Sequence, residues 1–256
     1  MPTSNKTGRT VKTTETAFTI IEGLEELDGA RVTELADHLG LADSTVHSHL
    51  ATLLEMGYVV KEGDQYQIGS RFLNLGEAAK ERKEAFDLVK PKVEQLAEET
   101  EERCQFIVEE HGRGVYLHRE TGSRAVWTDS GLGRRIYLHS TAAGKTVLAT
   151  LSDERVEEII ERWGLPPLTD QTITDPDELF AELETVREQG FATNVEESTE
   201  GLRAVGVPIV DGDGKLVGAL SVSGPSHRMK GEWFESEIPN LLLGTANELE
   251  LNLKYS

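Results

Sequence analysis

The sequence predicts an α+β chain in two parts: a helical N-terminal third and a longer C-terminal part that mixes strands with helices. Residues 13–56 place apolar side chains at helical spacing in three short runs, and β-rich residues follow near position 60. From residue 104 onward, short β-rich runs alternate with amphipathic helical runs. A length of 256 residues is enough for two domains. We therefore divide the chain into an N-terminal arm at 1–12, a first domain at 13–70, a linker helix at 71–84 and a second domain at 85–256.

The first two predicted helices are short. Residues 13–27 keep a helical period of apolar side chains and end at Asp28-Gly29, which favour a turn. Residues 31–39 form a second helix, which ends at Gly40. Because a third helix begins near residue 43, the sequence contains the helix, glycine-containing turn and helix that define a helix-turn-helix.

The third helix, at 43–56, has two chemically distinct faces. Asp43 is its candidate N-cap, and Val46, Leu50 and Leu53 recur at the spacing of one helical face. The other face carries short polar groups suited to hydrogen bonds with base edges and phosphates. Any surface helix also has a polar face, so this helix alone does not decide between DNA contact and simple solvation. These polar residues are Ser44, Thr45, His47 and Ser48, with His49 and Thr52 at the margin.

A β-hairpin is predicted directly after this helix. Tyr58-Val59-Val60 and Tyr66-Gln67-Ile68 are β-rich and flank a turn at Glu62-Gly63-Asp64. A hairpin in this place corresponds to the wing of a winged helix-turn-helix, which favours DNA binding over the solvated-helix interpretation.

The charged run after the hairpin predicts two more helices. Phe72 to about Lys83 is expected to be the linker helix, and Phe86 to Glu101 the first helix of the second domain. We expect Pro91 to begin a helix at its first turn rather than to interrupt one. The apolar residues of the linker helix could meet a partner subunit: Leu73, Leu75, Ala78 and Ala79.

The rest of the chain alternates strands and helices and shows no internal repeat. Asp211-Gly212-Asp213-Gly214 is expected to form the tight turn between the last two strands. The expected strands are 104–109, 114–118, 124–128, 191–194, 202–210 and 215–223. The expected helices are 139–151, 153–163, 176–189 and 233–251.

The net charge of −20 argues against nucleic-acid binding, because DNA-binding domains usually carry a basic patch. Either the chain does not bind nucleic acid, or an acidic surface overlies a DNA-binding protein. The second interpretation fits a high-salt cytoplasm, in which acidic surfaces stay soluble. Residues 1–12 support it, because they contain Lys6, Arg9 and Lys12 and no acid. Such an arm could follow the DNA backbone or a minor groove.

Several other classes of function are excluded by the composition and motifs. Cys104 is the only cysteine, so no intramolecular disulfide and no cysteine-based metal site is expected. No run approaches the ~20 apolar residues of a membrane span, and no signal peptide opens the sequence. Ala143-Gly144-Lys145-Thr146 is similar to the end of a phosphate-binding loop but lacks its upstream glycine, since position 139 is His. We therefore expect a cytoplasmic protein that is not an enzyme and needs no cofactor or metal.

The chain from about residue 12 to 252 resembles the IclR family of bacterial and archaeal regulators. The resemblance to its DNA-binding part rests on Ser44-Thr45-Val46-His47, Leu50-Ala51-Thr52-Leu53, Gly57-Tyr58 and Tyr66-Gln67-Ile68-Gly69. In the second part it rests on Leu138 to Ala149, on Gly190-Phe191-Ala192 with Glu196-Glu197, on Gly201 to Ile209, and on Gly218 to Pro225 with Arg228. Motifs in the right order along one chain are far more specific than any one of them alone.

The resemblance implies a winged helix-turn-helix, a linker helix and a larger GAF-like domain that binds an effector. It implies a transcriptional regulator, usually a homodimer or a dimer of dimers, which binds a palindromic operator in double-stranded DNA. Operator affinity would change when a small metabolite binds: an organic acid, a sugar acid or an aromatic compound. One departure is Ser48, which replaces an arginine common in the family and moves base readout toward His47, His49 and Thr45. The candidate DNA-binding residues are Lys6, Arg9, Lys12, Arg31, Thr33, Ser44, Thr45, His47, Ser48, His49, Thr52 and Lys61.

Effector-binding residues are carried over from the family position by position. Ser221 and Ser223 alternate on a strand and therefore face the same way, so either a polar ligand or neighbouring backbone must satisfy their hydroxyls. Ala142 and Ala143 near a helix start leave room for a carboxylate, or else serve tight helix packing. The candidates are Trp127, Asp129, Ala142, Ala143, Asn194, Leu202, Ala204, Ser221 and Ser223.

A different class of function is kept as the alternative. The chain could be a small-molecule sensor that does not bind DNA and uses its helix-turn-helix for protein contact. A steep dependence of DNA affinity on salt would separate the two, because phosphate contacts release counterions.

Overall fold

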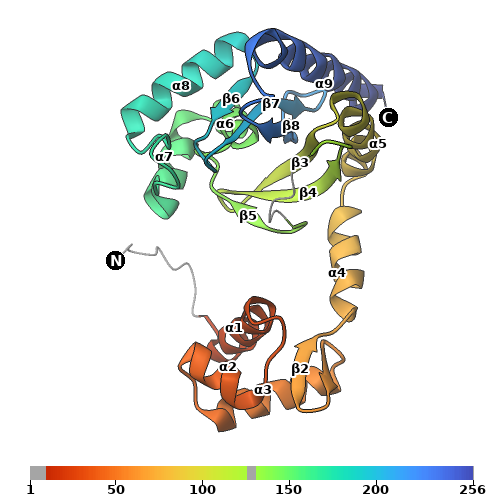
Figure 1. The fold of residues 1–256 in the computed structure, drawn as a ribbon, viewed down its shortest axis with the longest axis vertical. Helices are drawn as coiled ribbons and strands as arrows, with labels where there is room; N and C mark the ends of the chain where they lie inside the picture. The colour runs from red at the N-terminus through yellow and green to blue at the C-terminus, as the bar shows by residue number, and fades with distance from the viewer. Residues whose placement is uncertain (1–9, 126–130, 256) are drawn as a thin grey trace. The chain divides into compact units, whose positions relative to one another are not determined.

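The computed structural model describes residues 10–125 and 131–255, and the chain divides into two compact units between Glu81 and Arg82 (Figure 1). The α+β class predicted from the sequence is confirmed, with a helix-turn-helix in the first unit and a curved sheet in the second. No helix of the described residues is long and apolar enough to cross a membrane.

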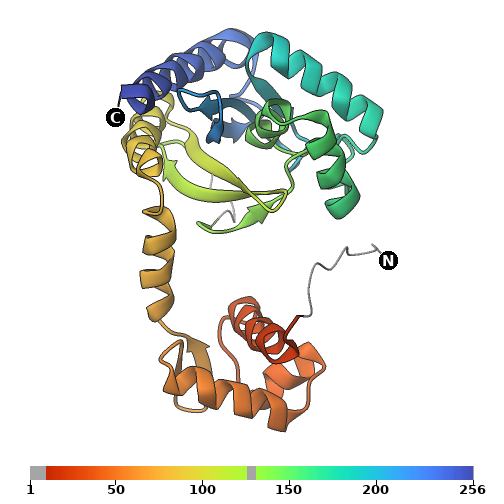
Figure 2. The ribbon, with the colours of Figure 1, turned by 180° about the vertical axis from the view of Figure 1, so that it is seen from behind.

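The first unit packs three helices and a hairpin around one core. Its buried centre includes Ile20, Leu24, Leu35, Val46 and Leu50. Figure 2 shows α3 beside the β1–β2 hairpin. The elements are α1 (Lys12–Glu26), α2 (Val32–Leu39), α3 (Asp43–Glu55), β1 (Val59–Glu62), β2 (Gln65–Ile68) and α4 (Arg71–Lys80).

The turn between α2 and α3 has the geometry expected of a helix-turn-helix. Gly40 lies in the left-handed region with φ 65°, and the amide of Leu41 bonds to the carbonyl of Ala36, which closes α2. The N-cap of α3 is Ala42 rather than Asp43, so the predicted cap is wrong by one residue. Asp43 instead lies in the first helical turn, where its charge still favours the helix dipole.

The prediction that Pro91 begins a helix is wrong, because α5 (Glu84–Thr100) runs continuously through it. A proline inside a helix removes one backbone bond. The carbonyl that loses it belongs to Asp87, which is exposed to solvent. Phe86, Val89 and Val93 are fully buried along one face on both sides of the proline. Tertiary packing of that face therefore outweighs the local cost.

The second unit is built on a six-stranded antiparallel sheet with the order β5-β4-β3-β8-β7-β6. The predicted strand at 124–128 is not found at Arg124 and Ala125, and its remaining residues lie outside the described part. The edge pairing with β4 comes instead from Arg135–Ile136. The strands are β3 (Arg103–Glu110), β4 (Arg113–Thr121), β5 (Arg135–Ile136), β6 (Ala192–Val195), β7 (Leu202–Val210) and β8 (Leu216–Pro225).

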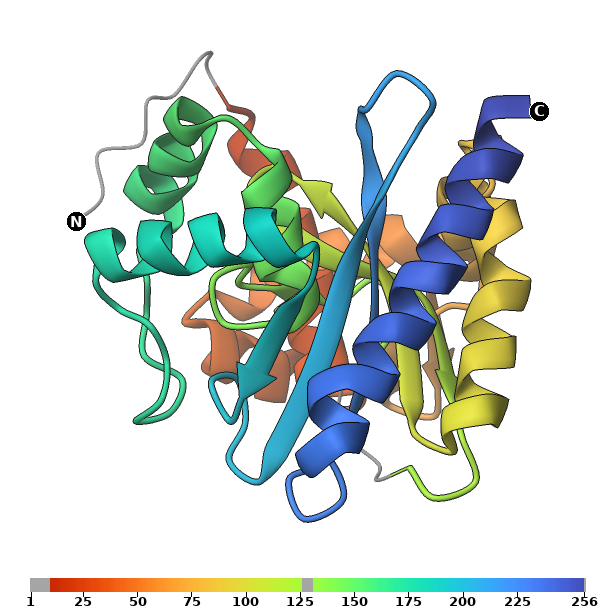
Figure 3. The same cartoon turned by 90° about the horizontal axis from the view of Figure 1, so that it is seen from above.

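Helices cover both faces of this sheet. On one face α5 and α9 lie side by side, as Figure 3 shows, and Lys92 of α5 pairs with Glu248 of α9 at 2.6 Å. On the other face α6 packs on β7 and β8, and α7 and α8 complete that layer. The predicted helix 139–151 begins later, at Ala142, because Thr141 caps it by accepting a bond from the amide of Gly144. The remaining helical elements are α6 (Ala142–Thr150), α7 (Asp153–Trp163), α8 (Pro176–Gln189), a π-helical turn η1 (Trp233–Glu237) and α9 (Ile238–Tyr255).

The start of α6 lies unusually close to the sheet. A Cβ atom at Gly206 of β7 would come within 2.6 Å of the backbone nitrogen of Ala143, so only glycine fits there. This contact fixes the N-terminus of α6 over β7, beside the polar side chains described below.

Candidate functional site

The polar face of α3 is accessible in the first unit. Ser44, His47, Ser48 and Thr52 are exposed, whereas Thr45 and His49 are half-buried. The hydroxyls of Ser48 and Thr52 donate to the carbonyls of Ser44 and Ser48, at 2.8 Å and 3.0 Å. Their oxygen atoms can still accept a bond from outside, but their protons are used within the helix.

Few of the predicted cations around α3 are free of intramolecular contacts. Arg31 pairs with Asp64 at the hairpin turn at 2.7 Å, with both side chains exposed, so the pair is easily opened. Lys61 lies over the ring of Tyr66, 5.0 Å from its centroid. Lys12 is exposed at the start of α1, as is Thr33 in α2, while Lys6 and Arg9 lie outside the described residues. Sequence reasoning missed Arg71, whose guanidinium stacks 4.7 Å from the ring centroid of Tyr58 and bonds to the carbonyl of Met56 at the end of α3.

An apolar groove of about 590 Å³ lies between α1, α3, α4 and the segment that joins α3 to β1 within the first unit. Phe18, Met56 and Leu75 line it and are exposed. Ser48, His49 and Thr52 also line this groove, which places the margin of the polar face of α3 next to an apolar surface. The full lining is Thr13, Thr14, Ala17, Phe18, Ile21, Ser48, His49, Thr52, Leu53, Met56, Tyr58, Phe72 and Leu75.

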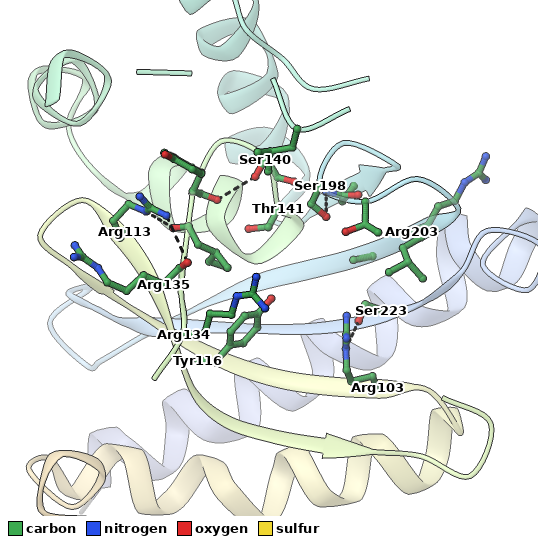
Figure 4. A pocket seen from close by; sticks show the side chains of 17 residues that line it. Arg103, Arg113, Tyr116, Arg134, Arg135, Ser140, Thr141, Ser198, Arg203 and Ser223 are labelled. Carbon is green, nitrogen blue, oxygen red and sulfur yellow. Dashed lines mark hydrogen bonds between the residues drawn. The ribbon is translucent and has the colours of Figure 1, made fainter. Parts of the chain in front are cut away.

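The second unit contains a cavity with two chambers on the sheet face that carries α6. The outer chamber, which Figure 4 shows, measures about 530 Å³, and the inner one about 40 Å³. Small-molecule sites usually occupy a few hundred Å³, so the outer chamber is of the right size for a metabolite. Eight residues line both chambers and connect them: Arg103, Tyr116, Ile136, Thr141, Asn194, Ser198, Ala204 and Ser223.

A polar network forms the floor of the inner chamber. The amide nitrogen of Gln105 donates to Ser221 Oγ at 2.8 Å and to Ser223 Oγ at 3.2 Å, and Arg103 Nε donates to Ser223 Oγ at 3.1 Å. The serine hydroxyls are therefore satisfied as acceptors by β3 side chains, not by neighbouring backbone as one interpretation of the sequence held. A hydroxyl that accepts a bond can still donate its proton, and Ser221 has no acceptor among the described residues.

The predicted effector residues are largely brought together, although their roles stay predictions. Asn194, Ala204 and Ser223 line both chambers, Leu202 lines the outer one, and Ala142, Ala143 and Ser221 line the inner one. Asn194 also donates to the carbonyl of Ser140, which holds β6 against the start of α6. Trp127 and Asp129 lie outside the described residues.

Sequence reasoning missed the basic and aromatic lining of the cavity. Arg103, Arg113 and Arg134 surround it together with Tyr116 and Tyr137 (Figure 4). Burial lowers the pKa of Arg103 and of Arg113 and raises that of Tyr116. Arginine stays protonated despite such a shift, so the cavity is basic in an otherwise acidic chain. The adjacent pair Arg134-Arg135 was the available signal in the sequence.

A buried ion cluster lies behind the cavity. Lys145 of α6 is 1 % exposed, and its Nζ lies 2.8 Å from Glu182 of α8 and 2.9 Å from Glu197, which follows β6. The amide of Glu197 in turn bonds to the side chain of Asn194. Burial raises the pKa of Glu197, and the nearby ammonium of Lys145 opposes this shift. The cluster thus connects the cavity wall at 194–198 to α6 and α8.

Groups that could hold a metal are not apparent in the part of the chain that the structure describes. No three His, Cys, Asp or Glu side chains gather there. Cys104 is buried, and burial raises its pKa to about 12, so its thiol stays protonated at neutral pH.

Comparisons with known proteins give a consistent result over nearly the whole chain. The model of the IclR helix-turn-helix domain matches residues 13–63, and that of the bacterial transcriptional regulator IclR C-terminal domain matches residues 78–251. A probable HTH-type transcriptional regulator ArcR of Halobacterium salinarum is 32% identical over 255 residues, covering 98% of this chain and 97% of the relative.

Solved structures agree with these matches. The crystal structure of Thermotoga maritima IclR superposes with a TM-score of 0.79 at 29% identity, covering 95% of this chain and 99% of that one. An IclR homolog from Microbacterium hydrocarbonoxydans, crystallised with 4-hydroxybenzoate, shares the fold at 21% identity, with a TM-score of 0.75 and coverage of 94% and 100%.

The buried cluster generates a stability prediction. Replacing Lys145→Met leaves the buried carboxylate of Glu197 and the half-buried one of Glu182 without their cation, which we expect to lower the free energy of unfolding by about 3–5 kcal/mol at pH 7. Without the ammonium, burial raises the pKa of Glu197 further, so the folded state holds a proton that the unfolded state releases. Stability is then lost as pH rises above about 4.5 and regained on acidification. Urea unfolding at pH 7 and pH 5 measures both effects.

Lys92→Met is the matched control, because the Lys92–Glu248 pair has a partly exposed carboxylate. We expect it to cost at most about 1 kcal/mol. Equal losses in the two variants at both pH values would contradict the proposed role of the buried cluster.

Proposed function

The chain belongs to the IclR family of transcriptional regulators, and from this premise we propose that α3 and the β1–β2 hairpin bind a specific DNA operator while the cavity of the second unit binds a small anionic effector. The observation that carries the proposal is the combination, in one chain, of a winged helix-turn-helix with an accessible polar α3 face and a separate basic cavity. Effector binding would change the affinity for the operator, which is the coupling between sites that defines an allosteric regulator.

In this proposal, short polar side chains of α3 read the DNA bases. Ser48 has no long side chain that could reach guanine, so His47 is the largest exposed polar group on the N-terminal half of α3. Thr45 and Ser44 flank it at the helix start. Lys12, Thr33, Lys61 and, once its pair with Asp64 opens, Arg31 would contact phosphates. Arg71 of α4 is added to this set because its guanidinium bonds to the carbonyl of Met56 at the end of α3.

The competing sensor that does not bind DNA is not favoured, because both family models match the chain in the arrangement of a DNA-binding regulator. We also propose that the protein catalyses no reaction. The cavity residues that the structure describes are arginines, hydroxyls, amides and apolar groups, which are suited to holding an anion. We propose a cytoplasmic location with high salt, where the net charge of −20 keeps the protein soluble.

We further propose that a second copy of the chain covers the apolar groove of the first unit, forming a homodimer that reads a palindromic operator. Leu73 and Leu75 of α4 are 71 % and 49 % exposed, and α4 has no buried residue. A helix whose apolar residues are all accessible is expected to bury them against a partner. Two-fold symmetry then presents two α3 helices to two half-sites.

The function is tested by selecting DNA sequences with the purified full-length protein and measuring their affinity at several KCl concentrations. We expect a selected sequence with a palindromic core, and affinity that falls with salt in proportion to the phosphates contacted. His47→Ala should weaken binding to that sequence by about tenfold to a hundredfold while changing binding to random DNA little.

His38→Ala is the control for this substitution, because His38 is exposed on α2 and pairs with Glu26. We expect it to leave operator affinity unchanged. Failure to select any DNA sequence at low salt, with the protein folded, would overturn the DNA-binding proposal.

Effector response is tested with Ser221→Ala and Ser223→Ala. Each substitution removes a hydroxyl from the inner chamber. We therefore expect the effector to change operator affinity less than in the wild type, while operator affinity without effector stays the same. Ser236→Ala, a serine that donates to the carbonyl of Glu232 outside the cavity, is the control. A normal effector response in both cavity variants would show that the inner chamber does not hold the ligand.

The dimer is tested with Leu75→Glu, which places a charge in the apolar groove. We expect sedimentation of this variant at the monomer mass and loss of cooperative operator binding, because burying an unpaired carboxylate is costly. Leu251→Glu changes an equally exposed leucine of α9 and should sediment as the wild type does. An unchanged mass for Leu75→Glu would place the dimer contact elsewhere.

A further inference from the structure

The two chambers differ so much in size that they cannot hold the same part of a ligand. The inner chamber of about 40 Å³ is comparable to the ~30 Å³ that one water occupies in the liquid. It therefore takes one small group, such as a carboxylate, beside Ser221 and the start of α6. If an effector binds in this cavity, as proposed above, the rest of the molecule must extend into the outer chamber.

The far side of the outer chamber carries arginines that have no carboxylate partner. Arg113 and Arg135 lie on the same side of the cavity (Figure 4), and neither is within ion-pair distance of an acid among the described residues. This is unexpected in a chain with 46 acidic and 26 basic residues. Six arginines elsewhere each contact an acid: Arg31, Arg82, Arg124, Arg155, Arg187 and Arg228.

Arg113 is also held in place rather than free to move. Its Nε donates to the carbonyl of Ile136 at 2.9 Å, and its guanidinium lies 3.7 Å from the ring centroid of Tyr137 and 5.1 Å from that of Trp163. Its Nη2 also donates to the carbonyl of Arg135 at 3.5 Å. These contacts occupy Nε, the faces of the guanidinium and one N–H of Nη2, so the remaining N–H groups stay available at its edge. Burial lowers the pKa of Arg113, and the charge of Arg135 lowers it further. Two like charges held this close are relieved by an anion between or beside them.

Arg203 also lines the outer chamber but does not take part. Arg203 lines the outer chamber with the base of its side chain, but its guanidinium turns away and donates to the carbonyl of Met229 at 3.3 Å (Figure 4). The positive charge on the far side of the outer chamber is therefore that of Arg113 and Arg135, and Arg134 lies beside Tyr116 in the same lining (Figure 4).

From this arrangement we propose that the effector carries two anionic groups, one seated in the inner chamber and the other held at the far side of the outer chamber by Arg113 and Arg135. The second group is a carboxylate or a phosphate, since both accept bonds from the edge of a guanidinium. The proposal rests on the cavity being the effector site. It adds that the outer chamber selects dianions over monoanions.

The test compares matched pairs of acids that differ only in the second charge, by titration calorimetry of the full-length protein at one fixed KCl concentration. Glutarate is paired with pentanoate and adipate with hexanoate, and 3-phosphoglycerate is paired with glycerate to distinguish phosphate from carboxylate. We expect at least one dianion to bind about tenfold more tightly than its monoanionic partner. A panel in which every monoanion binds as tightly as its partner, or in which no dianion binds, overturns the proposal.

Arg113→Gln should remove the preference for the dianion while leaving the affinity for the monoanion unchanged. Arg113 also bonds to the backbone of β5, so its replacement could disturb the local structure. Arg135→Gln, at an exposed position, therefore serves as a second variant and should reduce the same preference in part. Arg155→Gln, whose arginine pairs with Glu158 away from the cavity, should change nothing. Equal weakening of both members of a pair in both cavity variants would indicate a purely structural role and overturn the proposal.

Measuring operator binding in parallel distinguishes a failure of this proposal from a failure of the proposed regulatory function. Selective DNA binding with no dianion preference would remove the proposed ligand class and leave the regulator intact. Absence of DNA binding under all conditions would instead contradict the proposed function as a regulator.

Discussion

The alternation of side chains along β8 is the constraint on which the second unit depends. Leu220 and Val222 point to the apolar layer under α5 and α9, so Ser221 and Ser223 must point to the opposite face. That face is only partly covered, because α6 begins at its close contact with Gly206 and the two chambers lie beside this start. The same pleat that builds the core therefore delivers two hydroxyls to the inner chamber, and a shift of one residue would exchange the two roles.

The charge of the cavity lining is opposite in sign to the net charge of the chain. Most of the surface is acidic, and most arginines outside the cavity are neutralised by nearby carboxylates. The cavity is lined by arginines, and the exposed polar face of α3 carries uncharged groups. A high salt concentration weakens exposed charge interactions more than buried ones. This division allows a basic, partly enclosed site to function within a protein whose outer surface repels anions.

Local patterns in the sequence were enough to predict the helix-turn-helix, the hairpin and most strands, because each depends on periodicity or on turn residues nearby. The errors came where distant packing decides: Pro91 is tolerated because Phe86 and Val93 are buried on either side of it, and β5 forms because Arg135 meets β4. Within the cavity, the family resemblance pointed to small residues such as Ala142 and Ser223. It did not reveal Arg103, Arg113 or Tyr116, because their convergence depends on how β3 and β4 lie beside β8 and β5.

The close approach of α6 to β7 at Gly206 has a consequence for protein engineering. At the start of α6, backbone is held against the backbone of β7, so substitutions there disturb folding before they alter recognition. The far wall consists of Arg113 of β4 and of side chains in and around β5, at the edge of the sheet. A biosensor for a new metabolite could therefore be built by exchanging Arg113 and residues 134–137, while the inner chamber and the scaffold around it are left as they are.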